Sequence, residues 1–272
     1  MKIVVLIDNN APENLACEWG FSAYIEFEGK HILLDAGQSD AFAQNARDLG
    51  IDLAAVDFAV LSHAHFDHAD GLPAFFEANE TAPLYVREST AEDCHGSKND
   101  NEYIGIAPGT LERYAARIRR VDGALEVAPR VWLLGHTTPD LAAEGARQGM
   151  LRMVDGELVP DDFSHEQTLA FETARGIVAL NSCSHAGLDN IVSELREAFP
   201  DQPICTLIGG LHLFMTPADE VRALCSRLRD AGVERIYTGH CTGDEAIAIL
   251  REELGDVCQV EQFESGLTID FD

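Results

Sequence analysis

The segment LSHAHFDHADG, which spans Leu61 to Gly71, constrains this 272-residue chain more than any other feature. Four side chains that bind metals well fall within six consecutive positions of it: His63, His65, Asp67 and His68. A hydrophobic run over residues 58–61 leads directly into them, which predicts a buried strand that ends at the cluster. Side chains two residues apart lie on one face of an extended strand, so His63 and His65 are expected to face one point.

The mixture of side chains in this segment indicates which metals it can bind. Neutral imidazoles together with a carboxylate suit zinc, iron, manganese or cobalt, and zinc is the usual ion at a nitrogen-rich site. We therefore predict one or two divalent metal ions, with zinc favoured and manganese or iron as alternatives. A polar surface cluster is the competing interpretation, but the core-type strand that precedes the segment favours a buried site.

The chain is acidic, with 47 Asp and Glu residues against 19 Lys and Arg residues and a net charge of −28. Such a surface repels phosphate backbones, so we expect no nucleic-acid partner. We expect a small-molecule substrate instead, and the sequence leaves the oligomeric state open. Hydrophobic residues make up 46% of the chain, which is typical of a globular protein.

Neither the first residues nor any later segment predicts an association with a membrane. Residues 1–8 contain too short an apolar run for a signal peptide, and no run approaches the length of a membrane span. The seven cysteines are odd in number and form no C-x-x-C pair, which favours reduced thiols over a disulfide framework. We therefore predict a cytoplasmic protein.

Repeated strand–loop–helix units without a low-complexity linker predict a single domain over residues 1–272. The first half is expected to form strands over 3–7, 84–86, 124–127 and 131–134, a hairpin over 21–34, and helices over 39–49 and 71–79. The second half is expected to form a hairpin over 168–180, strands over 204–208, 234–237, 257–260 and 267–270, and helices that end near 199, 231 and 254. The stretch 87–108 is polar without a clear period and is predicted to be either a lid or a disordered excursion. The stretch 135–165 is also polar, has a period only over 150–154 and 157–159, and is a second candidate to border a site.

Three further histidines share one sequence context. His185, His212 and His240 each follow an apolar strand-type run and lie in or beside a glycine-bearing turn that precedes a helix. Sites in α/β proteins are built where strands end in loops, so we predict His185 and His240 as ligands and leave the role of His212 open. The other histidines show no supporting pattern and are interpreted as non-ligands: His31, His95, His136 and His165.

Three other residues beside these motifs have two interpretations each. Cys183 and Cys241 lie close to predicted ligands, and we favour small buried packing residues over a ligand role. Asp35 ends the hydrophobic run 32–34, where it is either a turn residue or an acceptor that orients a ligating imidazole.

These residues resemble a known family, the metallo-β-lactamase-fold hydrolases. The resemblance rests on H-x-H-x-D-H after a strand, on the upstream motif LLDAG at residues 33–37, and on the later histidine-bearing turns. The motifs GFS at 20–22, CSHAG at 183–187, IGGLHL at 208–213 and GHCTG at 239–243 are similar to one subgroup, often labelled dihydropterin-ribofuranosylaminobenzene 5′-phosphate synthase-like. The resemblance covers essentially the whole chain.

The resemblance implies an α/β fold, a four-layer αββα sandwich with a metal site at one edge of the sheets. It implies two ligand sets: His63, His65 and His185 for one metal, and Asp67, His68 and His240 for the other. The family's bridging aspartate has no counterpart, because the corresponding stretch 209–212 contains no carboxylate. His212 is then a substitute ligand, a proton donor or a substrate-binding group, and Asp35 matches the family's supporting aspartate.

We therefore predict a metal-dependent hydrolase that uses a metal-bound hydroxide on a small ester, with a phosphate ester or phosphodiester favoured. Asp67 is the residue expected to hold the nucleophile, and His212 is the candidate general acid. Two alternatives remain at this point: a mononuclear iron oxygenase or related redox enzyme on the same fold, and a non-catalytic metal-binding module.

Replacement of His63 by alanine is expected to abolish metal binding, because it removes a central nitrogen ligand. Elemental analysis of the purified variant checks this expectation. Full metal stoichiometry in the variant would refute the predicted site.

Overall fold

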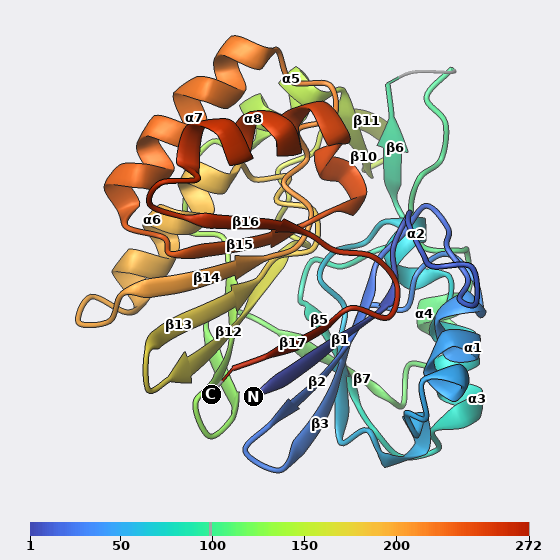
Figure 1. Ribbon diagram of the computed structural model, residues 1–272. Helices are drawn as coiled ribbons and strands as arrows, with labels where there is room; N and C mark the ends of the chain where they lie inside the picture. The colour runs from blue at the N-terminus through green and yellow to red at the C-terminus, as the bar shows by residue number, and fades with distance from the viewer. Residues whose placement is uncertain (98–99, 272) are drawn as a thin grey trace. The chain divides into compact units, whose positions relative to one another are not determined.

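The computed structural model describes residues 1–97 and 100–271, and its contacts divide the chain into two compact units (Figure 1). Unit 1 comprises Met1–Asp122, Leu141–Glu166 and Glu264–Asp272, and unit 2 comprises Gly123–Asp140 and Gln167–Phe263. The single-domain prediction concerns how these units associate, and it stays a prediction. Each unit is described by itself below.

Unit 1 is built on a seven-stranded sheet with the order β17-β1-β2-β3-β4-β5-β7. Its strands are β1 (Lys2–Ile7), β2 (Ser22–Phe27), β3 (Lys30–Leu34), β4 (Phe58–Val60), β5 (Leu84–Arg87), β7 (Ile118–Val121) and β17 (Thr268–Asp270). The pairs from β17 to β3 are antiparallel, whereas β3, β4, β5 and β7 are parallel. The carboxyl ends of these four strands therefore lie at one edge of the sheet.

Short helices connect these strands and cover one face of the sheet (Figure 1). They are α1 (Ala41–Asp48), η1 (Leu53–Ala55), α2 (Phe66–Ala69), α3 (Leu72–Ala78) and α4 (Thr110–Arg113). Phe42 of α1 and Phe75 of α3 share a buried cluster with Leu33 and Leu84 of the sheet. Burial of such side chains is the main stabilising contribution in a layer of this kind.

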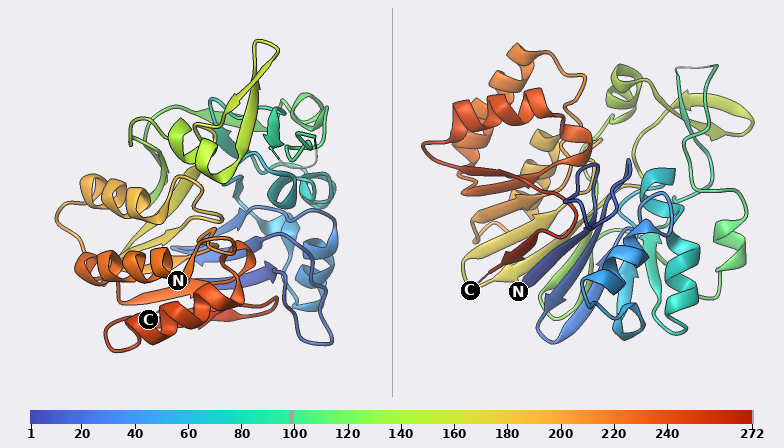
Figure 2. Two further views of the ribbon diagram at one scale, coloured as in Figure 1. Left: turned by 90° about the horizontal axis from the view of Figure 1, so that it is seen from above. Right: turned by 45° about the vertical axis from the view of Figure 1, so that its right-hand side comes forward.

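A second, three-stranded sheet in unit 1 contains parts of both polar stretches, and two of its strands match the periods at 150–154 and 157–159. It has the order β11-β10-β6 and contains β6 (Cys94–Gly96), β10 (Met150–Val154) and β11 (Glu157–Pro160). Helix α5 (Ala142–Gln148) lies beside it (Figure 2). Sequence periodicity could not predict β6 or its pairing, because its partner β10 lies more than 50 residues away and the β6 side chains are partly half-exposed.

Unit 2 contains the other seven-stranded sheet, with the order β16-β15-β14-β13-β12-β9-β8. Its strands are β8 (Leu125–Ala128), β9 (Val131–Gly135), β12 (Gln167–Thr173), β13 (Gly176–Leu180), β14 (Ile204–Ile208), β15 (Arg235–Thr238) and β16 (Gln259–Gln262). Strands β13 to β16 are parallel, and the connections between them contain α6 (Leu188–Ala198), α7 (Ala218–Ala231), η2 (His240–Thr242) and α8 (Asp244–Leu254). The loops after β13, β14 and β15 therefore leave the sheet at the same edge.

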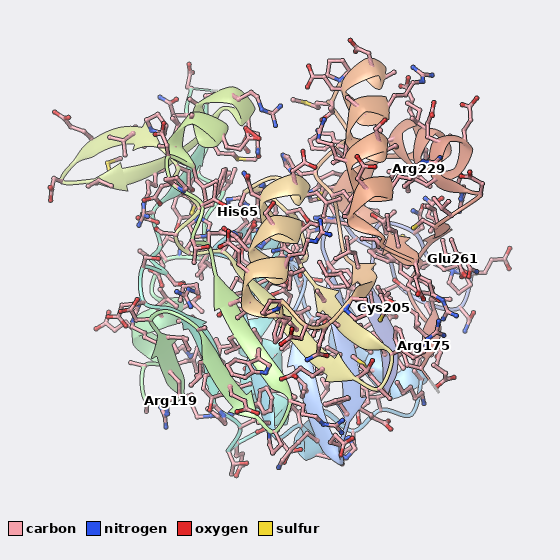
Figure 3. All side chains as sticks on the ribbon, turned by 90° about the vertical axis from the view of Figure 1, so that its left-hand side faces the viewer. His65, Arg119, Arg175, Cys205, Arg229 and Glu261 are labelled. Atoms are coloured by element: carbon pink, nitrogen blue, oxygen red, sulfur yellow. The ribbon has the colours of Figure 1, made fainter. Side chains whose placement is uncertain are left out.

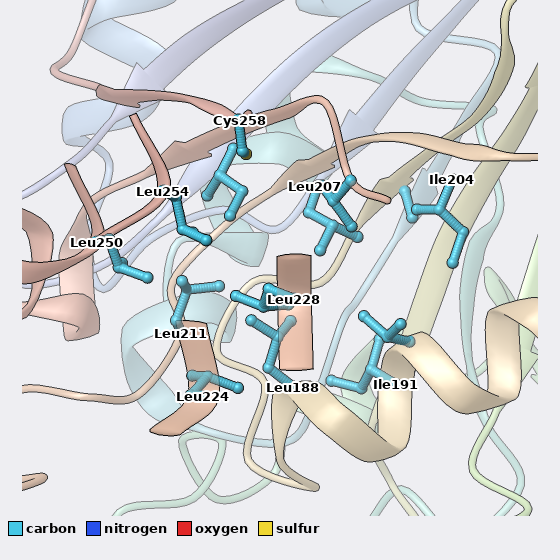
Figure 4. Packing of buried hydrophobic residues seen from close by; sticks show 14 of the residues in the cluster. Leu188, Ile191, Ile204, Leu207, Leu211, Leu224, Leu228, Leu250, Leu254 and Cys258 are labelled. Atoms are coloured by element: carbon cyan, nitrogen blue, oxygen red, sulfur yellow. The ribbon is translucent and has the colours of Figure 1, made fainter. Parts of the chain in front are cut away.

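The three long helices of unit 2 pack on one face of this sheet (Figure 4). Each helix contributes buried aliphatic side chains to the contact: Leu188, Ile191 and Leu195 from α6, Leu224 and Leu228 from α7, and Leu250 and Leu254 from α8. They share one cluster with Leu207 of β14 and Ile236 of β15. Charged residues such as Arg175 and Arg229 lie at the surface instead (Figure 3).

The predicted mixed α/β fold class is confirmed, because helices cover a seven-stranded sheet in each unit. The helix predicted over 39–49 begins at Ala41, with Asp40 before it. The Ser39 hydroxyl donates to Glu18 and accepts from the Ala41 N–H at 3.2 Å. Among the described residues, no helix has the length and apolar character that crossing a membrane requires.

Replacement of Leu250 by alanine is expected to lower the free energy of unfolding by about 2–5 kcal/mol, because it leaves a cavity in the core of unit 2. The Leu250 side chain is fully buried in this cluster. Urea denaturation of the metal-free protein measures the change. Val257→Ala is the matched control, because Val257 is 50% exposed and should change stability little. Equal stability of the two variants would contradict the packing described here.

Candidate metal centre

The carboxyl ends of β3 and β4 place the first predicted ligands. Asp35 follows β3 and Ser62 follows β4, and the Asp35 N–H donates to the Val60 carbonyl at 2.9 Å. We had expected His63 and His65 to lie on an extended strand. Because β4 ends at Val60, they lie in the turn that follows it instead. This turn leads into α2, whose first turn contains Asp67.

The structure brings the four predicted ligands of unit 1 together in a buried cluster. The ring centre of His63 lies 4.6 Å from that of His65 and 4.2 Å from that of His68. The Oδ2 atom of Asp67 lies 3.7 Å from Nε2 of His68. Each of the four residues is less than 10% exposed, and Figure 3 labels His65. Their assignment as ligands stays a prediction.

The carboxylate of Asp35 orients two of these imidazoles. It accepts from the Ser62 N–H at 2.7 Å, from the Ser62 hydroxyl at 2.6 Å and from Nδ1 of His68 at 2.7 Å. Because the Ser62 hydroxyl donates to Asp35, its oxygen accepts from Nδ1 of His63 at 2.8 Å. Both imidazoles therefore carry their proton on Nδ1 and present the Nε2 lone pair as a possible ligand. Of the two sequence interpretations of Asp35, the structure supports the orienting acceptor.

Close backbone approach joins this turn to the LLDAG motif. The Ala36 N–H donates to the His68 carbonyl at 2.8 Å, and the Gly71 N–H donates to the Gly37 carbonyl at 3.1 Å. A Cβ atom on Gly71 would lie 1.9 Å from the Ala36 carbonyl oxygen, so only glycine fits there. The two motifs therefore form one rigid hydrogen-bonded unit.

The environment of His65 keeps its imidazole neutral. Burial lowers the pKa of His65 to about 4. A neutral imidazole is the form that binds a metal ion, so His65 does not need to lose a proton at neutral pH.

His165, which sequence reasoning interpreted as a non-ligand, lies in the same region of unit 1. Its ring centre is 5.7 Å from that of His65 and 6.4 Å from that of His63. Cys94 and Asp161 lie beside it, and all three side chains are fully buried. Burial raises the pKa of the Cys94 thiol. The only sequence signal for this group is the four-residue spacing of Asp161 and His165 within a polar stretch.

The histidines predicted in unit 2 follow three adjacent parallel strands. His185 comes after β13, His212 after β14 and His240 after β15, and the ring centres of His185 and His212 lie 4.3 Å apart. His212 and His240 have φ values of 49° and 45°. This left-handed conformation costs about 1–3 kcal/mol per residue and is concentrated at functional sites. The Nδ1 atom of His212 is buried without a hydrogen-bond partner among the described residues.

The two cysteines near these histidines are buried, and the packing role that we favoured for them stays a prediction. Cys183 and Cys241 are about 2% exposed or less, and their Sγ atoms lie 3.5 Å apart. Burial raises the pKa of the Cys241 thiol, but Cys183 and the imidazoles of His240 and His212 lower it well below its usual range. All seven cysteines of the chain are free thiols.

The donor groups of unit 1 fit a divalent metal ion. The ligand atoms of His63, His65 and Asp67 lie within 4.8 Å of one another. Buried imidazole nitrogens combined with carboxylate oxygens form the donor set that zinc, iron and manganese prefer.

Comparisons with known proteins agree with this fold. Residues 20–145 match the sequence pattern of the Metallo-beta-lactamase superfamily. The chain is 26% identical to the 7,8-dihydropterin-6-methyl-4-(beta-D-ribofuranosyl)-aminobenzene-5′-phosphate synthase of Methanocaldococcus jannaschii, over 100% of this chain and 97% of that protein.

Solved structures show the same similarity. A crystal structure described as a metal-dependent hydrolase of the beta-lactamase superfamily superposes with a TM-score of 0.87 at 28% identity, over 100% of this chain and 99% of that chain. A diphosphatase superposes with a TM-score of 0.55 at 15% identity, over 100% and 98% of the two chains, and shows the fold alone.

The variant Asp35→Asn is expected to weaken zinc binding about 10- to 100-fold, because an amide N–H₂ would face the donors of Ser62 or His68. Competition with a chromophoric chelator measures the dissociation constant. Asp48→Asn is the matched control, because Asp48 is exposed and contacts Gln44. Unchanged affinity in Asp35→Asn would show that the carboxylate does not orient the ligands.

The lowered pKa of His65 predicts a pH dependence of stability in the metal-free protein. Between pH 6.5 and about pH 4 the unfolded chain binds a proton at His65 that the folded chain excludes. The free energy of unfolding should therefore fall as the pH falls through this window, by roughly 3 kcal/mol from this residue. Urea denaturation of the wild type and of His65→Gln isolates the effect, and a difference that does not vary with pH would contradict it.

Proposed function

We propose that this chain, which has the metallo-β-lactamase fold, is a metal-dependent hydrolase of a small ester, with a phosphate ester or phosphodiester favoured. The observation that carries the proposal is the buried donor cluster of unit 1, in which Asp35 and Ser62 hold the protons of His68 and His63 on Nδ1. A purely structural cluster would not require two imidazoles to be oriented in this way. This observation favours a metal-binding site.

The names of two relatives bear on the reaction class and on the substrate. A structure at 28% identity is described as a metal-dependent hydrolase, and a relative at 26% identity is named as the synthase of a 5′-phosphate compound. Because one name specifies a hydrolase and the other a synthase, the reaction class of this chain rests on its own residues. The acidic surface favours a small substrate over a nucleic acid.

The proposed ligands come from the two sequence-derived sets: His63, His65 and His185, and Asp67, His68 and His240. A bound divalent cation would supply a Lewis acid and would lower the pKa of a water molecule toward neutrality. The carboxylate of Asp67 would accept a hydrogen bond from that water and hold it for attack. His212 would donate a proton to the leaving oxygen.

The proposal is tested by elemental analysis of the untreated protein together with three substrates: p-nitrophenyl phosphate, bis(p-nitrophenyl) phosphate and p-nitrophenyl acetate. Turnover of a phosphate ester by the wild type, and its loss in His63→Ala, is the expected result. His31→Ala is the matched control, because His31 lies on β3 and hydrogen-bonds Tyr24. Bound iron with substrate-dependent oxygen uptake would overturn the hydrolase proposal in favour of a redox enzyme.

The variant His212→Ala is expected to lower kcat about 100-fold or more while metal content is retained, because a general acid contributes that order of rate. Steady-state kinetics and elemental analysis on the same preparation give both quantities. The loss should be smaller for a substrate with a good leaving group, which needs less protonation. Parallel loss of metal and activity would make His212 a ligand instead.

A further inference from the structure

We propose that Asp161 and His165 are a positioning pair that holds the backbone between His63 and His65 in its metal-binding shape. The inference rests on the proposed metal site, because it concerns the turn that carries two of its ligands. All four residues belong to unit 1.

The contact that carries the inference is a hydrogen bond to the backbone of this turn. The N–H of Ala64, which lies between the two histidines, donates to Nδ1 of His165 at 3.2 Å. Ala64 and His165 are both fully buried. A buried N–H that loses its acceptor costs about 1–3 kcal/mol, so removal of the His165 ring would favour a different conformation of the turn.

Asp161 determines which nitrogen of His165 is the acceptor. Its Oδ2 atom lies 3.0 Å from Nε2 of His165, and a carboxylate can only accept. Nε2 therefore carries the proton and Nδ1 has the lone pair that Ala64 requires. Without this carboxylate His165 could carry its proton on Nδ1, and that N–H would face the Ala64 N–H.

The position of Asp161 is itself fixed by the three-stranded sheet and α5. Its N–H donates to the Met150 carbonyl of β10 at 3.0 Å, and its Oδ1 accepts from the Phe163 N–H at 2.8 Å. A Cβ atom on Gly145 of α5 would lie 2.1 Å from the Asp161 carbonyl oxygen, so the helix packs directly on this segment. The three-stranded sheet and α5 therefore support the predicted metal site.

A second metal site is the competing interpretation of the same residues. Ligand atoms of His65, Cys94, Asp161 and His165 lie within 4.8 Å of one another, and Sγ of Cys94 is 3.5 Å from Nε2 of His165. A metal at this position would need the Nε2 lone pair, whereas the Ala64 N–H at Nδ1 requires a proton on Nε2. A proton on Nε2 satisfies the contacts of His165 with both Ala64 and Asp161. A metal on Nε2 would leave the Ala64 N–H without an acceptor.

The experiment compares three variants of His165 in the full-length protein. In asparagine the side-chain oxygen can occupy the position of Nδ1, whereas in glutamine it reaches only the position of Nε2. We expect His165→Ala and His165→Gln to weaken zinc binding about 10- to 100-fold, with His165→Asn close to the wild type. Asp161→Asn should also weaken zinc binding. Asp162→Asn is the matched control and should leave zinc binding unchanged, because Asp162 is exposed and bonds Ser164.

Hydrogen exchange of the Ala64 amide in the metal-free protein gives a second readout, which does not depend on activity or on metal. Exchange should be faster in His165→Ala and His165→Gln than in the wild type and His165→Asn. If asparagine fails to rescue either readout, or if no variant changes them, the positioning pair is wrong. If the wild type binds no metal but Ala64 exchange follows this order, the proposed function fails and the pair is retained.

Cobalt substitution tests the competing interpretation. A cysteine-to-cobalt absorption band that disappears in Cys94→Ser would show a metal bound among these residues and would overturn the inference. Absence of a Cys94-dependent band in a cobalt-loaded protein supports the hydrogen-bonded pair.

Discussion

The buried carboxylate of Asp35 is the interaction on which the rest of the metal centre depends. It accepts three hydrogen bonds from Ser62 and His68, and through the Ser62 hydroxyl it also determines the tautomer of His63. A buried charge is expensive unless it is fully hydrogen-bonded, so these donors and the carboxylate stabilise one another. One residue at the end of β3 thereby orients two imidazoles at the end of β4.

The surrounding backbone makes this arrangement rigid. The parallel strands β3 and β4 bring Asp35 and Ser62 together, and close approach at Gly71 joins both motifs through main-chain hydrogen bonds. From a different direction, the pair of Asp161 and His165 contacts the same turn. A site held from two sides loses little conformational entropy when a ligand binds, which favours binding.

Much of the fold could be predicted from local sequence. Apolar runs predicted most strands of both large sheets, and residues that begin or end helices predicted α1, α3 and α7. In the three-stranded sheet a local period marked β10 and β11, but β6 and α5 were not predicted. Strand β6 pairs with β10 across more than 50 residues, and α5 has a single buried residue, so no local pattern marks them.

The sequence by itself determined the donor types and their spacing, because H-x-H-x-D-H is a local pattern of side-chain chemistry that survives any detail of folding. Only the tertiary structure decided which groups orient those donors. Asp35 contacts His68 across 33 residues, and His165 contacts Ala64 across 101. Hydrogen-bond partners so far apart are specified by the packing of strands and loops. That packing identified Asp35 as an orienting acceptor and not only a turn residue. It also placed His165 against the backbone of the turn that carries His63 and His65.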